Sequence, residues 1–308
     1  MKRLSFVVSL PTDDNDYQQE QAAAAQRAAQ RLGVDVKIVH AGNDAVMQSQ
    51  QLLEFVQKPA QRPDALIFEP AGGTAFPQVA RAAAVAGIGW VVLNHEADYV
   101  GDLRRAYKVS VFAISSDHEE IGRIQGQQFQ ALLLKGGTVL YIEGPANSSA
   151  AKARTRGMNQ TKPANIQLKS MRANWTEESS YRSVSSWLRL RTSQDMRIDL
   201  VGAQDDSMAM GARKAFGEIA GAERWLKLPF TGCDGMPKTG QSWVRSGLLA
   251  ATIYIRPNTD LAIEMLVDSM NHGTTFPEQK ITAPESIPAL ADLAASGSGK
   301  QKRGAGAY

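Results

Sequence analysis

Short apolar runs recur along the chain, and segments with helical spacing of apolar positions lie between them. The β-branched and aliphatic runs predict ten strands, at residues 4–10, 34–39, 65–68, 90–93, 109–114, 138–142, 166–170, 198–201, 228–232 and 250–255. The alanine-rich segment 19–32, which is followed by Gly33, predicts a helix with its usual stop residue, and segments 46–56 and 78–86 behave likewise. This alternation is typical of parallel sheets that helices cover on both faces.

Ten strands are too many for one comfortable open sheet. The alternation of apolar runs and helical segments is interrupted at 96–108 by polar residues. We interpret this interruption as a division into two similar α/β lobes. A further extended piece is expected at 273–282. The Gly-, Ser- and Lys-rich segment 296–308 is expected to be a loosely held tail.

Size and composition restrict the class of protein. A chain of 308 residues with 43% apolar and 21% charged residues is typical of a soluble protein with two domains, and it favours neither a membrane protein nor a disordered one. Basic residues exceed acidic ones by only three (34 against 31), so nucleic acid is not an expected partner. Because Cys233 is the only cysteine, internal disulfides and thiol-rich metal sites are excluded.

The N-terminal run 4–10 resembles the core of a secretory leader, but it is short, and Pro11 and acidic residues follow it. We interpret it as the first strand and expect no membrane insertion. Two cellular locations are consistent with this sequence: the chain is either cytoplasmic or an exported form from which a leader has been removed.

Two aspartates follow apolar runs in the stretch 198–235. Asp205 ends the run that begins at Ile198, Asp234 follows the run 228–233, and the segment 207–216 between them has helical spacing. A strand, a helix and a second strand in this order form a crossover unit, and ligands bind at the carboxyl ends of such strands. Both aspartates are therefore candidates for binding a ligand.

Other strand ends carry polar and aromatic residues. Asn15, Asp16 and Tyr17 stand just before or at the start of the first helix, where helix capping is the alternative explanation. Asn94 and His95 close the fourth run, and a histidine there can equally be a structural hydrogen-bonding residue.

The loop after the sixth run is rich in small residues and leads into a helix that carries Arg154 and Arg156. An arginine in this place is either a solvated surface charge or, if it points inward, a fork of donors suited to paired hydroxyls or a carboxylate. Trp175 follows the seventh run. Because an exposed tryptophan is costly, it either fills the core or offers a flat face to a ligand.

These residues resemble the type I periplasmic sugar-binding proteins, which include ribose and galactose binders and share their core with the lactose-repressor family. The resemblance covers about 4–284, and its most specific parts are Ser148 to Arg154 with Gly157, Ala203 to Ala212, and Thr231 to Gly235. It implies two Rossmann-like lobes whose parallel sheets are flanked by helices. The lobes would comprise 1–114 plus 257–282 and 115–256 plus 283–308, with a ligand cleft between them and a hinge of three segments near 114–117, 255–257 and 281–284.

The resemblance also implies roles for single residues. Arg154 and Asp234 stand at the positions of the sugar-clamping arginine and the hydroxyl-accepting aspartate, and Trp175 and Tyr17 at those of ring-stacking aromatics. The chain departs from ribose-type members at four positions, where it has Asn94, His95, Asp205 and Ile255.

These departures bear on the ligand. An apolar Ile255 at a position that is usually polar removes a hydrogen bond, which is worth about 1.5–3 kcal/mol when the partner is charged, so ribose itself is not the expected ligand. A carboxylate at Asp205 and a histidine in place of an arginine make the expected cleft more acidic. An amino sugar or another weakly cationic polyol is therefore one hypothesis for the ligand.

The expected function is that of a solute-binding protein that closes around a sugar, amino sugar or polyol, with no metal or cofactor. An ABC permease or a sensor kinase would read the closed shape of an exported form. A ligand-sensing regulator of the lactose-repressor type is the alternative, without direct DNA contact because the first strand begins at Leu4.

An enzyme is a third possibility, because Asp205 and Asp234 could exchange protons. However, the sequence contains no nucleophile elbow, phosphate loop or dinucleotide fingerprint, and its four histidines have no metal-ligand spacing. We expect binding rather than catalysis.

Overall fold

The structure is a computed structural model that describes residues 3–73, 75–95, 97–194 and 196–295. The chain divides into two compact units. Unit 1 comprises Met1–Ser116 and Arg256–Thr282, and unit 2 comprises Asp117–Ile255 and Ala283–Tyr308. The chain thus passes from one unit to the other three times, after Ser116, Ile255 and Thr282. The tail expected at 296–308 lies outside the described residues.

A six-stranded parallel sheet forms the centre of unit 1, in the spatial order β11, β5, β4, β3, β1, β2. The strands are β1 (Ser5–Leu10), β2 (Asp35–His40), β3 (Ala65–Phe68), β4 (Gly89–Leu93), β5 (Val111–Ser116) and β11 (Gln279–Thr282). The extended piece expected at 273–282 thus supplies the edge strand β11, which is parallel to β5. In the described part of unit 1, the α-helices that accompany the sheet are α1 (Asp16–Leu32), α2 (Ala45–Gln57), α3 (Pro77–Val85), α4 (Val100–Ala106) and α12 (Thr259–His272).

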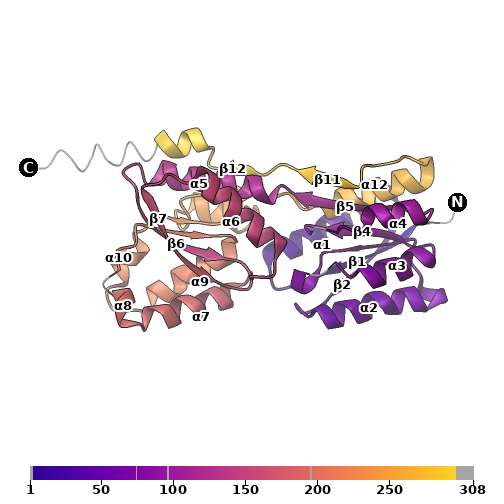
Figure 1. Cartoon of the computed structure of the whole chain (residues 1–308), viewed down its shortest axis with the longest axis horizontal. Coiled ribbons are helices and arrows are strands. Elements are labelled where there is room, and N and C mark those ends of the chain that lie inside the picture. Colours follow the sequence, from indigo (N-terminus) through magenta and orange to yellow (C-terminus); the bar gives the residue numbers. More distant parts are fainter. Residues whose placement is uncertain (1–2, 74, 96, 195, 296–308) are drawn as a thin grey trace, which may run out of the picture. The chain divides into compact units, whose positions relative to one another are not determined.

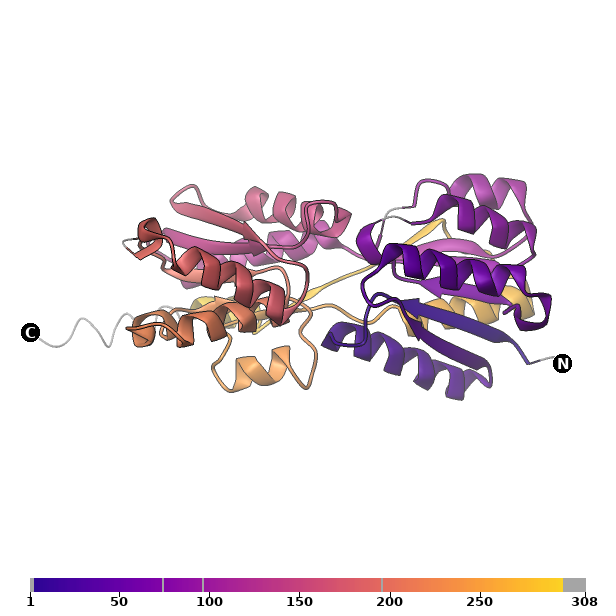
Figure 2. The same cartoon turned by 90° about the horizontal axis from the view of Figure 1, so that it is seen from below.

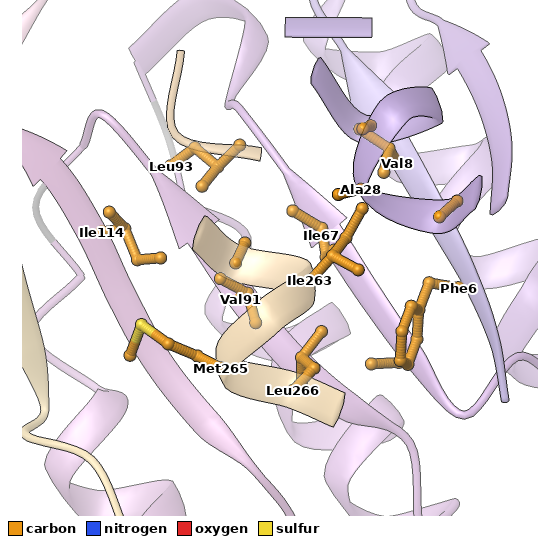
Figure 3. Packing of buried hydrophobic residues seen from close by; sticks show 14 of the residues in the cluster. Phe6, Val8, Ala28, Ile67, Val91, Leu93, Ile114, Ile263, Met265 and Leu266 are labelled. Atoms are coloured by element: carbon orange, nitrogen blue, oxygen red, sulfur yellow. The ribbon is translucent and has the colours of Figure 1, made fainter. Parts of the chain in front are cut away.

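The helices of unit 1 cover both faces of its sheet (Figure 1). Alternate residues of a strand point to opposite faces, so Phe6 and Val8 pack under α1 and α12, whereas Val7 packs under α2, α3 and α4. Figure 3 shows the apolar cluster that contains Phe6 and Val8, in which Ile263 and Leu266 of α12 lie beside strand residues such as Ile67. The near-continuous apolar runs of the sequence follow from burial on both sides.

The interruption at 96–108 is not a division between lobes. The helix α4 lies there, and β5 follows it in the same sheet, paired with β4. The short α4 was missed because only Val100, Gly101 and Leu103 are buried, which gives too few apolar positions for a periodic signal.

Unit 2 contains a four-stranded parallel sheet in the order β7, β6, β8, β9. The strands are β6 (Gly137–Glu143), β7 (Ile166–Arg172), β8 (Leu200–Ala203) and β9 (Phe230–Thr231). The helices are α5 (His118–Leu132), α6 (Ser149–Thr161), α7 (Glu177–Leu188), α8 (Arg191–Gln194), α9 (Asp206–Gly217), α10 (Ala222–Leu226) and α11 (Gly240–Arg245). Figure 2 shows unit 2 from a second side, with helices on both faces of the sheet. The α/β class predicted from the sequence is confirmed.

The tenth predicted strand, 250–255, does not simply extend this sheet. Its central part, β10 (Thr252–Tyr254), pairs antiparallel with β12 (Glu285–Ile287). Two isolated parallel bridges, Thr231 with Ala251 and Asp234 with Tyr254, connect this segment to the end of β9. The strand β12 had no sequence signal because its three residues are exposed or half-buried. No helix among the described residues has the length and apolar character that a membrane span requires.

Candidate functional site

Arg154 is a buried cation on α6, with a side chain only 6% exposed. The Ser148 hydroxyl caps this helix by accepting a hydrogen bond from the amide of Ala151 (3.2 Å). Gly122 of α5 lets the two helices approach closely, because a β-carbon there would lie 2.0 Å from the Arg154 carbonyl oxygen. The Nη1 of Arg154 donates to the carbonyl oxygen of Gln204, while its Nε is buried without a hydrogen-bond partner among the described residues.

Trp175 lies beside this arginine. The guanidinium carbon of Arg154 is 5.4 Å from the centroid of the indole ring, which is the geometry of a cation–π contact. Trp175 is half-buried, follows β7 and has a φ of 62°. One part of the side chain packs on the apolar cluster of unit 2, which matches the core-filling alternative, whereas a flat face offered to a ligand remains a prediction.

Asp205 and Asp234 lie next to each other in unit 2, and both are buried. Asp205 caps α9, where its Oδ1 accepts a hydrogen bond from the amide of Met208 (2.8 Å). Burial raises the pKa of Asp234 well above its ordinary value, and the neighbouring charge of Asp205 raises it further. Arg154 acts in the opposite direction, and a hydrogen bond joins the two carboxyl groups. The pair therefore retains a proton more readily than two isolated carboxyls.

Two neighbours of this cluster were not singled out from the sequence. Asp206 is buried and accepts hydrogen bonds from the amide of Gly235 (2.8 Å) and the hydroxyl of Thr252 (2.7 Å). Gln204 accepts from the amide of Gly144 (2.9 Å) and donates to the hydroxyl of Tyr141 (2.9 Å). Both flank Asp205 in the sequence, but no sequence pattern indicates that these polar residues are buried.

Ile255 is the last residue before the chain enters unit 1. Its side chain is buried, and its amide donates to the carbonyl oxygen of Asp234 (3.0 Å). It thus contacts the carboxylate segment through its backbone.

In unit 1, Tyr17 and Asn94 are joined by a hydrogen bond from the Asn94 amide to the tyrosine hydroxyl (3.0 Å). The same amide nitrogen donates to Oε2 of Glu69 (3.1 Å), and the side-chain amide of Gln21 also reaches this carboxylate (3.3 Å). Glu69 was missed in the sequence, although it is the first polar residue after the run 65–68. Asn94 was selected because it directly follows a predicted strand, and the same reasoning applies to Glu69.

Asn15 acts as the N-cap of α1, with its Oδ1 accepting from the amides of Tyr17 (2.9 Å) and Gln18 (3.3 Å). This matches the capping alternative. Asp16 is half-buried in the first turn of the same helix.

His95 is half-buried, and burial lowers its pKa to about 4, with a backbone hydrogen bond to Leu93 acting in the opposite direction. The ring is therefore neutral at physiological pH. Its Nδ1 is buried and has no hydrogen-bond partner among the described residues.

Cys233 is fully buried, and burial raises the pKa of its thiol well above the ordinary value. A thiol of this kind is a poor nucleophile. Within the described ranges, no group of three or more His, Cys, Asp or Glu side chains is arranged to hold a metal ion.

A hollow of about 720 Å³ lies elsewhere in unit 1. Its lining includes Leu4, Asp64, Gly89 and Val111, which stand at the amino ends of the strands. It is therefore at the opposite end of the sheet from Asn94 and Glu69.

The structure thus brings the predicted site residues together in two groups. Arg154, Trp175, Asp205 and Asp234 gather at the carboxyl ends of the strands in unit 2, and Tyr17 and Asn94 do so in unit 1. The donors and acceptors of the first group, set against an aromatic face, suit a small polyhydroxylated molecule. That the two groups face one ligand remains a prediction.

Several known proteins are similar to this chain in sequence. The putative rhizopine-binding protein of Rhizobium meliloti is 29% identical over 59% of this chain, a match that spans 57% of the relative's own length. The ribose import binding protein of Bacillus subtilis is 25% identical over 92% of this chain and 86% of its own length.

Solved structures share the fold. A periplasmic solute-binding protein from Actinobacillus succinogenes with bound D-allose has a TM-score of 0.80 at 20% identity, covering 95% of this chain and all of that one (100%). The Caulobacter myo-inositol-binding protein has a TM-score of 0.78 at 20% identity over 95% of both chains. The family model described as the periplasmic binding protein domain matches residues 6–274, most of the sequence. The chain therefore belongs to the periplasmic binding protein family.

Proposed function

We propose that this protein is a solute-binding protein that closes around a sugar or a sugar derivative. The observation that carries the proposal is the cluster in unit 2, where the buried guanidinium of Arg154 lies against the half-buried indole of Trp175. Beside them stand the joined carboxyl groups of Asp205 and Asp234. Flat donors, strong acceptors and an apolar face within one small volume suit a molecule that carries both hydroxyls and a ring of C–H groups.

The chemistry of a sugar accounts for each part of the cluster. The C–H bonds of a pyranose or cyclitol ring pack on an aromatic face, and its hydroxyls donate to carboxylates and accept from guanidinium N–H groups. The Nε of Arg154 is buried with its hydrogen-bonding capacity unused among the described residues. Because this atom is closed to water, a ligand oxygen would reach it only when the side chain moves on binding.

We assign the opposite side of the ligand to unit 1. Tyr17, Asn94 and Glu69 stand at the carboxyl ends of the strands of unit 1. The cluster of unit 2 likewise stands at the carboxyl ends of the strands of its own sheet. The three passages between the units would act as a hinge, and closure would exclude water from the ligand. The relatives that bind ribose and rhizopine, by their names, support a ligand of this class.

The biological role we propose is uptake or sensing, with an ABC permease or a sensor kinase reading the closed form. One solved neighbour is the fructose-binding periplasmic domain of a hybrid two-component system, so the fold serves sensing as well as transport. We propose binding without catalysis, because hydroxyl recognition explains the Asp205–Asp234 pair without a reaction.

The experiment is a thermal-shift screen of D-ribose, L-arabinose, D-allose, myo-inositol, xylitol and D-glucosamine, followed by calorimetry of each hit. A ligand that binds only the folded state raises the melting temperature by mass action. The shift should disappear in Arg154→Met and Trp175→Leu. It should persist in Trp243→Leu, which alters a half-buried tryptophan packed on the same apolar cluster. Turnover of a compound, or an unchanged shift in Arg154→Met, would contradict the proposal.

A specific observation favours an amine-bearing ligand over a neutral one. The charged groups that act on Asp234 are Asp205, Arg154 and Asp206, so negative charge prevails around it. An ammonium group beside the pair would let both carboxyls ionise and would release the retained proton.

Calorimetry of D-glucosamine against D-glucose, in two buffers with different ionisation enthalpies, tests this refinement. Proton release should accompany the amine only and should be lost in Asp234→Asn. Binding of neutral sugars alone would reject the amine while leaving the broader proposal intact.

A further inference from the structure

A buried asparagine, Asn258, stands at the start of α12 without capping it. Its side chain is fully buried and makes no capping hydrogen bond, although asparagine is a preferred N-cap residue. Gln21 of α1 performs this role instead, because its Oε1 accepts from the amides of Asn258 (2.8 Å) and Thr259 (3.1 Å). The side chain of Asn258 is thereby released for contacts elsewhere.

Those contacts reach the residues that border the passages between the units. The Nδ2 of Asn258 lies 3.4 Å from the hydroxyl oxygen of Ser116, the last residue of unit 1 before the first passage. Its Oδ1 accepts from the hydroxyl of Thr282 (3.2 Å), the last residue before the third passage. Asn258 itself lies two residues after Arg256, where the chain re-enters unit 1. One amide therefore connects the ends of all three passages.

The same amide also contacts the candidate ligand site. Its Nδ2 donates to Oδ1 of Asn94 (3.0 Å), whose own amide nitrogen binds Tyr17 and Glu69. The hydroxyl of Tyr17 in turn donates to the carbonyl oxygen of Arg256 (3.3 Å). A shift of Asn94 or Tyr17 toward a ligand would therefore alter hydrogen bonds at the ends of the passages.

A buried polar network of this kind is not needed for packing, since apolar residues of similar volume would fill the space. Its members Asn94 and Asn258 are both buried, so each arrangement must satisfy their donors and acceptors to be populated. A network that touches every passage therefore discriminates between arrangements of the passages.

We propose that Asn258 is a positioning residue that couples the ligand-side amide of Asn94 to the three passages and so sets the balance between open and closed forms. The inference rests on the proposed function, because it assumes that ligand binding drives closure. In this proposal Asn258 acts through Asn94 and does not itself contact the ligand.

The test uses single-molecule fluorescence transfer between dyes on the two units of the full chain. Val46→Cys in unit 1 and Leu190→Cys in unit 2 give exposed labelling sites, at 65% and 54% exposure. Cys233 is buried with a raised thiol pKa and should stay unlabelled. Histograms would be recorded without ligand and with D-ribose or myo-inositol.

Two variants remove the coupling, and a third variant serves as the matched control. Asn258→Leu removes every contact of the amide at similar volume, and Thr282→Val removes only the hydroxyl that reaches Asn258 and Ser116. Ser269→Ala lies on the same helix and removes a hydrogen bond to Ser110 that lies outside the network.

We expect Asn258→Leu and Thr282→Val to change the ratio of the two populations without ligand by about three- to tenfold, and Ser269→Ala to leave it unchanged. Histograms of both network variants that coincide with the wild type would overturn the inference, and so would an equal change in Ser269→Ala. Because this comparison uses only the histograms recorded without ligand, it is independent of the ligand screen. A failed screen with shifted histograms would reject the proposed function alone.

Discussion

The indole of Trp175 lies directly over the backbone of Gly144. A β-carbon on Gly144 would come within 2.2 Å of Cζ2 of the indole, and the Gly144 amide is fixed by its hydrogen bond to Gln204 (2.9 Å). The ring that contacts Arg154 thus occupies the space that a side chain at position 144 would need.

Gly144→Ala should therefore displace Trp175 and weaken ligand binding. Overpacking of this kind costs about 1–3 kcal/mol of the free energy of unfolding, and the displaced ring loses its contact with the guanidinium. Urea unfolding and calorimetry with a compound from the screen measure the two effects. Gly217→Ala is the control, since a β-carbon there meets nothing within 4 Å. Unchanged affinity in Gly144→Ala would show that the ring position is not needed for binding.

Asp234→Asn should stabilise the free protein at neutral pH while weakening ligand binding. The folded pKa of Asp234 is raised, so its contribution to stability is fully present below the unfolded pKa and is lost as pH rises through the folded pKa. The amide cannot ionise and avoids this loss. Urea midpoints at about pH 5 and about pH 8 should therefore converge in the variant. Asp268→Asn should show no such change between the two pH values, because hydrogen bonding to His272 lowers the pKa of that exposed carboxyl and its contribution is lost only in stronger acid. A wild-type protein as stable as the variant at the higher pH would contradict the prediction.

His95→Gln should remove a loss of stability that the wild type suffers in acid. The folded pKa of His95 is about 4, below the ordinary value of 6.5. The wild-type stability is therefore fully present above the unfolded pKa and declines as pH falls toward the folded one, by about 3 kcal/mol in total. The measurement is the difference in urea midpoint between wild type and variant, at about pH 7 and about pH 5. A difference that does not change with pH would show that the ring is not held neutral.

The sequence predicted the sheets well, because strands buried on both faces leave continuous apolar runs that can be read without tertiary information. It also placed Asp205, Asp234 and Asn94 correctly at strand ends, since a run must end where the sheet does. The buried network around Asn258 and Gln21 had no such signal. Both are polar residues at or near helix starts, and their burial arises from the packing of α1 against α12, whose residues are far apart in the sequence.

Backbone conformation was equally invisible in the sequence. Asn94, Trp175 and Asp234 have positive φ angles of 56°, 62° and 102°, a region that residues other than glycine seldom adopt. Each of the three was selected as a site residue for its side chain alone. Strained backbone often collects at functional sites, where the surrounding structure supplies the compensating energy. Asn43 and Phe76 share this conformation outside the site, so a positive φ does not by itself distinguish a functional residue.

Asp206→Asn should have the opposite effect on stability to Asp234→Asn, although the two carboxyls belong to the same cluster. Asp206 accepts hydrogen bonds from the amide of Gly235 and the hydroxyl of Thr252, so its charge is used within the fold. Hydrogen bonds to a charged group contribute about 1.5–3 kcal/mol each, and an amide that presents an N–H to either donor would lose one of them.

The free energy of unfolding from urea titration should accordingly fall in Asp206→Asn and rise in Asp234→Asn at neutral pH. A β-carbon on Gly232 or Gly240 would lie 2.1 Å from the Asp206 carboxylate, so its surroundings have little room to rearrange. If both variants changed stability in the same direction, the division of this cluster into a structural carboxylate and a ligand-binding pair would be wrong.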